Sequence, residues 1–240
     1  MALYEDCVCL AQARLIEGKR KKAHVCTIAL HRPSGGFIRL CLPFNSSPES
    51  EIRRWDVFSF EGSPDEMDTR RESVGLQVFL GKHGQATNGE RKDIHKHILS
   101  TYKYEQELNE ERQSVGILLF DKDTVSFEEG PLSSREKEYR LIMQDKGLFF
   151  PNYKLYMTAK SEGYQSRHFR KQVLEWNFFE AIRKGLDPLA AFGQYKHPYA
   201  ILGNTPYQRN GFMIVSFLSA PSGFMSYALS VHDTNRQTQH

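Results

Sequence analysis

Apolar and polar residues alternate along most of the first third of the chain. Alternation with a period of two places the apolar side chains on one face of an extended strand. A Pro/Gly turn at residues 32–36 joins two of these segments as a hairpin. Five short strands with no long helix between them predict a small β-barrel. The predicted strands are residues 6–12, 23–30, 37–42, 55–60 and 73–80.

The pattern changes in the middle of the chain. Residues 90–102 and 133–143 place apolar side chains at helical spacing, so both predict helices. Between them, residues 115–120 form an uninterrupted apolar run that predicts a buried strand, and residues 124–127 are expected to pair with it across an Asp-Lys-Asp turn. The middle is therefore expected to be helical and charged, with one buried hairpin.

The last third resumes the strand pattern around one longer segment. Residues 153–159 alternate as a strand, and residues 167–184 predict a long helix that ends at Gly185. Glycine is the common residue just past the end of a helix. Further strands are predicted at residues 199–202, 212–218 and 224–231.

Several short motifs follow one another along the chain. The N-terminal ones are VCLAQA, HVCTIAL, GGFIRLCLPF, RRWDVFSF and DTRRES, and the later ones are Leu174-Glu175-Trp176, AILGN and GFMIVSFL. In these motifs and their order the chain resembles the prokaryotic dual OB-fold domain proteins over most of its length. The resemblance implies two OB-like barrels and, by analogy of fold, binding of nucleic acid or nucleotides. Family members often carry a Cys/His cluster before the Glu-Trp helix, whereas here that stretch keeps only His168, so no metal site is expected.

Pattern and resemblance together predict an α+β fold with two small OB-like β-barrel modules and connecting helices. We expect an N-terminal OB-like module over residues 1–85 and a helical, charged bridge with one buried hairpin over residues 86–150. A C-terminal OB-like module with a long helix is expected over residues 151–232, followed by a disordered tail over residues 233–240.

The net charge of +3 is unevenly distributed. Residues 1–60 hold nine Lys/Arg against six Asp/Glu, residues 61–150 hold thirteen against eighteen, and residues 151–240 hold ten against five. Basic ends could face a polyanion, and the acidic middle could meet a protein partner. No segment has the length of a membrane helix and the N-terminus lacks the order of a signal peptide, so we expect a cytoplasmic protein without membrane contact.

The four cysteines all fall in the first fifth of the chain. Cys7 and Cys9 alternate within an apolar run, which places them on one strand face. Zinc sites usually combine two C-x2-C pairs, and that pattern is absent. We therefore expect reduced core thiols, with no metal and no cofactor.

Three clusters of basic and aromatic residues are candidates for nucleic-acid binding. Cations neutralise phosphates, and aromatic rings stack on unpaired bases. The clusters are a basic connection, a strand with the turn that follows it, and a C-terminal group. Their members are Lys19, Arg20, Lys21 and Lys22; Phe37, Arg39, Arg53 and Arg54; and Arg167, Arg170, Lys171, Lys196, Tyr207 and Arg209.

Each cluster also has a structural interpretation. The basic connection can be a solvated turn, and the C-terminal residues can shape a loop. Phe37 and Arg39 share one strand face, so if that face is buried Arg39 needs a partner such as Asp68 or Glu72.

The catalytic motifs of phosphate-loop, zinc-protease, hydrolase and dinucleotide-binding enzymes are absent. We therefore expect a non-enzymatic nucleic-acid-binding protein, a subunit of a larger nucleoprotein complex in a prokaryotic defence or mobile-element system. One alternative is a sensor of a nucleotide or anionic ligand, with a pocket near Arg39 or Arg209. The other is a metal-dependent nuclease in which Asp65 and Glu90 would hold the metal. His95 and His97, two apart on a predicted helix, face different directions and are poor joint ligands.

Overall fold

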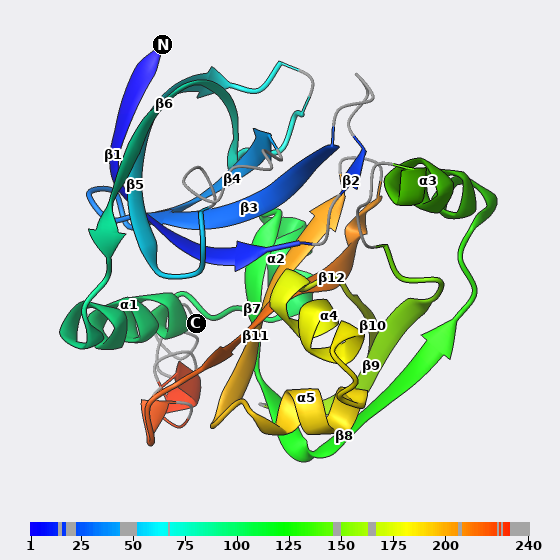
Figure 1. Cartoon of the computed structure of the whole chain (residues 1–240). Coiled ribbons are helices and arrows are strands. Elements are labelled where there is room, and N and C mark those ends of the chain that lie inside the picture. The colour runs from blue at the N-terminus through cyan, green and yellow to red at the C-terminus, as the bar shows by residue number, and fades with distance from the viewer. Residues whose placement is uncertain are drawn as a thin grey trace.

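The computed structural model shows two β-sheets accompanied by short helices (Figure 1). It describes residues 1–13, 16–17, 23–43, 52–66, 68–145, 150–162, 167–205, 208–224, 226 and 228–230. The strands are β1 (Ala2–Gln12), β2 (Ile16–Glu17), β3 (Ala23–His31), β4 (Gly36–Pro43), β5 (Asp56–Pro64), β6 (Ser73–Gln85), β7 (Val115–Leu118), β8 (Phe120–Gly130), β9 (Lys154–Ser161), β10 (His168–Val173), β11 (Pro198–Thr205) and β12 (Gln208–Ser219). The helices are α1 (Asn88–Ser100), α2 (Glu105–Glu110), α3 (Ser134–Asp145), α4 (Trp176–Arg183) and α5 (Pro188–Gly193).

The first sheet closes into a five-stranded barrel. β1 pairs with both β3 and β5, and the ring runs β1-β3-β4-β6-β5. All of its contacts are antiparallel except the β4–β6 contact, in which Arg39 and Leu40 pair with Ser73 and Val74. All five predicted strands of this region are confirmed. Alternation fills the interior with apolar side chains, among them Cys7, Cys9, Ile38, Leu40, Phe58 and Phe60.

The second sheet has the order β7-β11-β12-β10-β9-β8. Its two end strands follow each other directly in the chain, with Leu119 between them. The sheet therefore curls until its two edges meet at that residue. Its strand contacts are antiparallel except the one between β10 and β12, which is parallel. The fold is thus α+β, with a closed barrel and a second curled sheet.

The predicted hairpin within residues 115–127 is wrong. β7 pairs with β11, while β8 pairs with β9. The continuous apolar run arises because both faces of β7 are buried, and such a run does not identify the neighbouring strand. These strands belong to the second sheet, which therefore begins well before the predicted module boundary at residue 151.

The predicted long helix over residues 167–184 is only half correct. Residues 168–173 form β10, and the helix α4 begins at Trp176. Phe169 and Val173 are four residues apart, a spacing that fits one helix face and one strand face equally well. The strand predicted at residues 224–231 is also wrong, since its described residues 224, 226 and 228–230 are helical. The helices predicted at residues 90–102 and 133–143 are confirmed as α1 and α3.

A large apolar cluster joins the two sheets. On β7 and β11 the residues Val115, Ile117, Tyr199 and Ile201 face Val8, Leu10 and Ile28 of the barrel and Ile94 and Ile98 of α1. The alternate residues Leu118, Ala200 and Leu202 point into the second sheet, with Phe178 and Phe217. Figure 1 shows β7 and β11 passing between the barrel and the rest of the second sheet. Within the described chain, no helix is both long and apolar enough to cross a bilayer.

Candidate nucleic-acid interface

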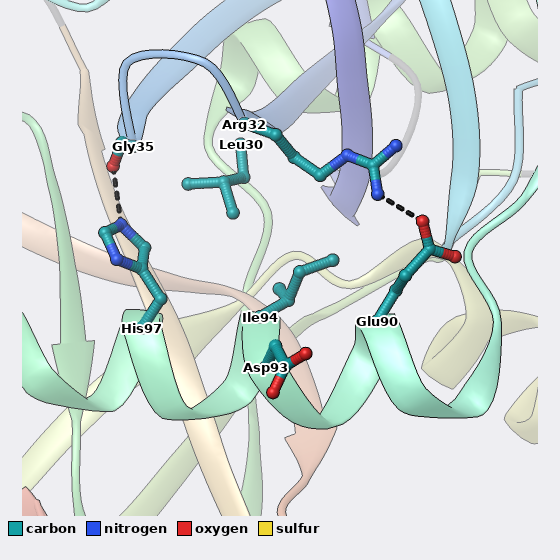
Figure 2. A pocket seen from close by; sticks show the side chains of 7 residues that line it. All are labelled: Leu30, Arg32, Gly35, Glu90, Asp93, Ile94 and His97. Atoms are coloured by element: carbon teal, nitrogen blue, oxygen red, sulfur yellow. Dashed lines mark hydrogen bonds and ion pairs between the residues drawn. The ribbon is translucent and has the colours of Figure 1, made fainter.

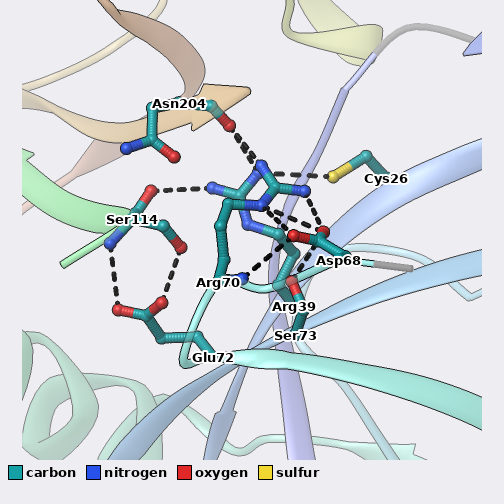
Figure 3. Close-up of polar contacts among 8 residues, drawn as sticks. All are labelled: Cys26, Arg39, Asp68, Arg70, Glu72, Ser73, Ser114 and Asn204. Atoms are coloured by element: carbon teal, nitrogen blue, oxygen red, sulfur yellow. Dashed lines mark hydrogen bonds and ion pairs between the residues drawn. The ribbon is translucent and has the colours of Figure 1, made fainter. Parts of the chain in front are cut away.

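The face of the barrel that carries Phe37 and Arg39 is covered by the second sheet. Arg39 is only 4% exposed. Its Nη1 donates to the Asn204 carbonyl at 3.1 Å and its Nη2 to the Ser114 carbonyl at 2.8 Å (Figure 3). A Cβ atom at Gly203 would lie 2.8 Å from Arg39 Nη2, so glycine permits this close approach. Burial lowers the pKa of Arg39, yet two carbonyl acceptors compensate its charge.

The predicted acidic partners of Arg39 bind other groups. Glu72 accepts from Ser114 N at 3.0 Å and from Ser114 Oγ at 2.6 Å. Asp68 pairs with Arg70, which also donates to the Asn204 carbonyl. The network therefore clamps the segment before β7 and the end of β11 onto the barrel. Arg39 is buried and bonded within the molecule, as its structural interpretation expects, with carbonyls in place of Asp68 or Glu72 as partners. Its contact with nucleic acid stays a prediction.

Arg54 also lies between the barrel and the second sheet. It forms an ion pair with Glu175, the residue before α4, and its Nη2 donates to Ser216 Oγ at 2.8 Å. Glu175 is 1% exposed and also accepts from Phe217 N at 2.6 Å. Arg54 is therefore engaged within the molecule, and its contact with nucleic acid stays a prediction. Phe37 packs against the apolar cluster between the sheets, while Arg53 is exposed.

Part of the C-terminal cluster lies on an open strand face. Along β10 the side chains of His168 and Arg170 point outward, whereas Lys171 points inward and is 7% exposed. Lys171 Nζ lies 2.6 Å from Glu105 Oε2 on α2, so its charge is already paired. The alternation within β10 therefore divides the predicted basic group between the surface and the interior.

We define the β9–β10 face as the outward side chains of Tyr156, Thr158, Lys160, His168 and Arg170. The strand register places His168 opposite Lys160 and Arg170 opposite Thr158. The Arg170 guanidinium lies 3.6 Å from the centre of the Tyr156 ring and pairs with Glu128 on β8. Lys160 and His168 are exposed at the end of the strands, with Asp121 of β8 opposite Lys160.

Gly130 makes room for the Tyr156 ring on this face. A Cβ atom at Gly130 would come within 2.7 Å of Tyr156 Cε2. The ring is half-buried, with the guanidinium of Arg170 stacked over one side. The face thus presents an Arg170–Tyr156 stack bordered by Lys160 and His168, and a guanidinium plane also suits stacking of an unpaired base.

A cleft of about 260 Å³ adjoins the β9–β10 face. It lies between the segment that joins α1 to α2 and the start of β10. Its aromatic and basic lining comprises Tyr102, Lys103, Tyr104, Arg167, His168, Phe169 and Lys171. Lys103 is bound to Glu111, while Arg167 is exposed. Arg167 and His168 line the cleft at the start of β10, so cleft and strand face form one continuous surface.

The remaining predicted binding residues are Lys196 and six residues whose side chains lie outside the described part of the structure. Lys19, Arg20, Lys21, Lys22 and Tyr207 lie outside the described residues, and of Arg209 only the backbone position in β12 is described. Lys196 is exposed between α5 and β11, where its backbone N–H donates to Ser219 Oγ at 3.1 Å.

A second hollow, of about 270 Å³, lies between α1 and the turn after β3 (Figure 2). Glu90 and Asp93 line it, and Arg32 is bound to Glu90 and to Asp6. His97 Nε2 lies 2.8 Å from the Gly35 carbonyl. Two carboxylates beside an arginine that is already paired make this hollow unfavourable for an anionic ligand.

The carboxylates of the nuclease alternative do not lie together. Glu90 completes the capping box of α1 with Thr87 and pairs with Arg32. Asp65 follows the opposite end of β5, where its N–H donates to the Ser73 carbonyl. His95 and His97 face different directions as predicted, since His95 is buried against Tyr199 and His97 is exposed.

The cysteine prediction is correct for three of the four thiols. All four cysteines are free, and Cys7, Cys9 and Cys26 are buried. Cys41 is exposed, because β4 reaches the part of the barrel where its outward face leaves the cover of the second sheet.

Several surface residues were missed by sequence reasoning. Tyr156 lies within the strand predicted at residues 153–159, and Lys160 directly follows that range, in the observed strand Lys154–Ser161. The alternation of that strand placed them on its outer face and could have identified them. Lys103 and Tyr104 carried no signal, because only the fold brings their segment beside β10. No protein-family model and no curated protein matches the chain.

Proposed function

We propose that this protein binds single-stranded nucleic acid along the β9–β10 face, with one nucleotide entering the adjoining cleft. The observation that carries the proposal is the exposed row of Lys160, His168 and Arg167 beside the Arg170–Tyr156 stack. Cations supply phosphate contacts and the guanidinium plane of that stack supplies a surface for a base, and neither requires a particular base. We expect an affinity that depends strongly on salt and weakly on sequence.

Strand order supports this location. The strands of each sheet can be numbered in chain order, leaving out the two-residue β2 and counting β7 and β8 as one bent strand. Around each ring the neighbouring strands then follow the order 1-2-3-5-4. We propose that both are OB-like modules, as the family resemblance implies. In OB-folds the second and third strands form the ligand face. In the barrel these strands are β3 and β4, whose outer face is covered around Arg39. In the second sheet they are β9 and β10, whose outer face is open.

The two sheets would then have different roles. In the barrel, the face that could hold a ligand is occupied by the contacts of Arg39 with Ser114 and Asn204. The second sheet presents the corresponding face to solvent. The proposal places binding on one module, with the other as its rigid support. Membership of a larger nucleoprotein complex, a protein partner on the acidic middle and a cytoplasmic location stay predictions.

Fluorescence anisotropy with labelled single-stranded DNA, single-stranded RNA and duplexes over a range of salt tests the proposal. Arg167→Ala and Lys160→Ala should each weaken binding about threefold or more at low salt and reduce the salt slope by about one. Arg183→Ala on α4 is the matched control, because it removes the same charge from an exposed arginine elsewhere. Absence of binding to every polymer, or an equal loss in the control, would refute the proposal.

The cleft also favours a second candidate, a sensor of a mononucleotide. Its aromatic and basic lining suits a base and a phosphate without any strand. A thermal shift with free nucleotides distinguishes the two. Stabilisation by a mononucleotide that is lost in Lys103→Ala and kept in Lys160→Ala would support the sensor, because Lys160 lies on the strand face outside the cleft lining.

A further inference from the structure

Two cysteines lie directly opposite each other on neighbouring strands. In the antiparallel β3–β4 pair, Cys26 is the register partner of Cys41, and Ile28 is the partner of Arg39. Directly opposed residues in such a ladder point their side chains to the same side of the sheet. The two sulfur atoms therefore project from the same face of the barrel.

The hydrogen bonds of Arg39 determine which kind of pair this is. Its backbone N–H donates to the Glu72 carbonyl on the other side of β4, at 2.8 Å, and so not to β3. The Ile28–Arg39 pair is thus a non-hydrogen-bonded pair. The pair types alternate along the ladder, so Cys26–Cys41, two residues further, is of the same type. Pairs of this type have Cα atoms about 4.5 Å apart, inside the range that a disulfide spans.

The two thiols differ in their exposure to solvent. Cys41 is exposed and accessible to a small reagent, whereas Cys26 is 8% exposed. Arg39 Nη1 donates to Cys26 Sγ at 3.8 Å (Figure 3). The thiol of Cys41 can therefore react first with the reagent. The thiol of Cys26 lies close enough to displace the bound reagent from Cys41.

We propose that Cys26 and Cys41 are a redox-active pair that a small disulfide, such as glutathione disulfide, converts to an intramolecular disulfide. The Cys41 thiolate attacks one sulfur of the reagent, which breaks the reagent's S–S bond and releases one glutathione thiolate. The Cys26 thiolate then attacks Cys41 Sγ, forms the Cys26–Cys41 bond and expels the second glutathione thiolate. Two thiols are oxidised, one disulfide is reduced, and two protons end on the released glutathiones.

The Cys26–Cys41 pair lies beside the contacts that join the barrel to the second sheet. Arg39 is hydrogen-bonded to Cys26 Sγ and holds the Ser114 and Asn204 carbonyls of the second sheet. The protein around the sulfur atom of Cys41 removes part of the water that would solvate a thiolate, which raises the pKa of Cys41 to about 12 although the residue is exposed. The reaction should therefore be slow at neutral pH and quicken about tenfold for each unit of pH while the protein stays folded.

The test uses the folded full-length chain incubated with glutathione disulfide at pH 8 and then quenched with acid. Intact mass should fall by roughly 2 Da, and dithiothreitol should reverse the loss. Tryptic digestion should yield a peptide containing Cys26 linked to a peptide containing Cys41. Cys41→Ser should abolish the linkage, and Cys26→Ser should instead accumulate the mixed disulfide at Cys41.

Cys7→Ser with Cys9→Ser is the matched control, because both side chains are fully buried in the barrel interior. This variant should form the linkage at the wild-type rate, provided circular dichroism shows that it is folded. In the wild type, a linked peptide that appears only when urea is present would overturn the proposal, as would persistence of four free thiols after prolonged oxidation. Both results come from the unmodified chain and do not depend on the folding of a variant.

Discussion

Glu175→Ala removes the carboxylate that ties the second sheet to the barrel. In the folded protein this carboxylate pairs with Arg54 and accepts from Phe217 N at 2.6 Å and from the Tyr195 hydroxyl at 3.0 Å. Its side chain is 1% exposed, so water cannot replace these contacts without a rearrangement. The variant would leave Arg54 as an uncompensated charge and Phe217 N as an unpaired donor.

The magnitude follows from burial. Removing one member of a buried ion pair typically costs about 3–5 kcal/mol, because the remaining charge has lost its solvent and gained no partner. Arg54 keeps its bond to Ser216 Oγ at 2.8 Å and its contact with the Tyr195 hydroxyl, which places the expected cost at the lower end, about 3 kcal/mol. The double variant Arg54→Met with Glu175→Leu removes both charges. It should cost less than the sum of the two single changes, by about 1 kcal/mol or more.

Urea unfolding followed by circular dichroism measures these free energies. Arg170→Ala is the control, because Arg170 pairs with Glu128 on the exposed β9–β10 face and its loss should change stability little. Additive effects of the two single substitutions would refute the reasoning. So would a Glu175→Ala variant as stable as Arg170→Ala, because burial would then not decide the strength of the pair.

Two further predictions concern stability. Burial, with a smaller contribution from Arg91, lowers the pKa of His95 to about 4, so the folded state resists protonation while the unfolded state binds a proton near pH 6.5. Stability should therefore fall as the pH drops from about 6.5 to 4, by up to about 3 kcal/mol, and urea titrations of His95→Phe should lack this component; equal slopes in both proteins would contradict it. Gly116→Ala would bring its Cβ within 2.2 Å of Leu108 Cδ1 and should destabilise the fold by about 1–3 kcal/mol. Gly89→Ala, in open space on α1, should instead stabilise it by about 0.5 kcal/mol, and a shared sign of the two effects in thermal unfolding would count against this explanation.

Period-two alternation was a reliable guide in the barrel, where each strand has one face in the interior. The strands of residues 6–12 and 37–42 lie where predicted, because the alternation of interior and exterior side chains shows in their sequence. The same rule failed at residues 168–173. There an inward lysine interrupts the apolar face, and the spacing of Phe169 and Val173 also fits a helix.

By itself the sequence determined that the chain is rich in strands, that Phe37 and Arg39 share one face, and that Cys7 and Cys9 point to one side. Local periodicity is enough for such statements, because it depends on residues close together in the chain. Only the tertiary structure decided what each face meets. Ser114 and Asn204 are far from Arg39 in sequence, yet they turn a candidate ligand contact into an internal clamp. The matching face of the second sheet stays open because no other element packs on it among the described residues, and no local pattern encodes that difference.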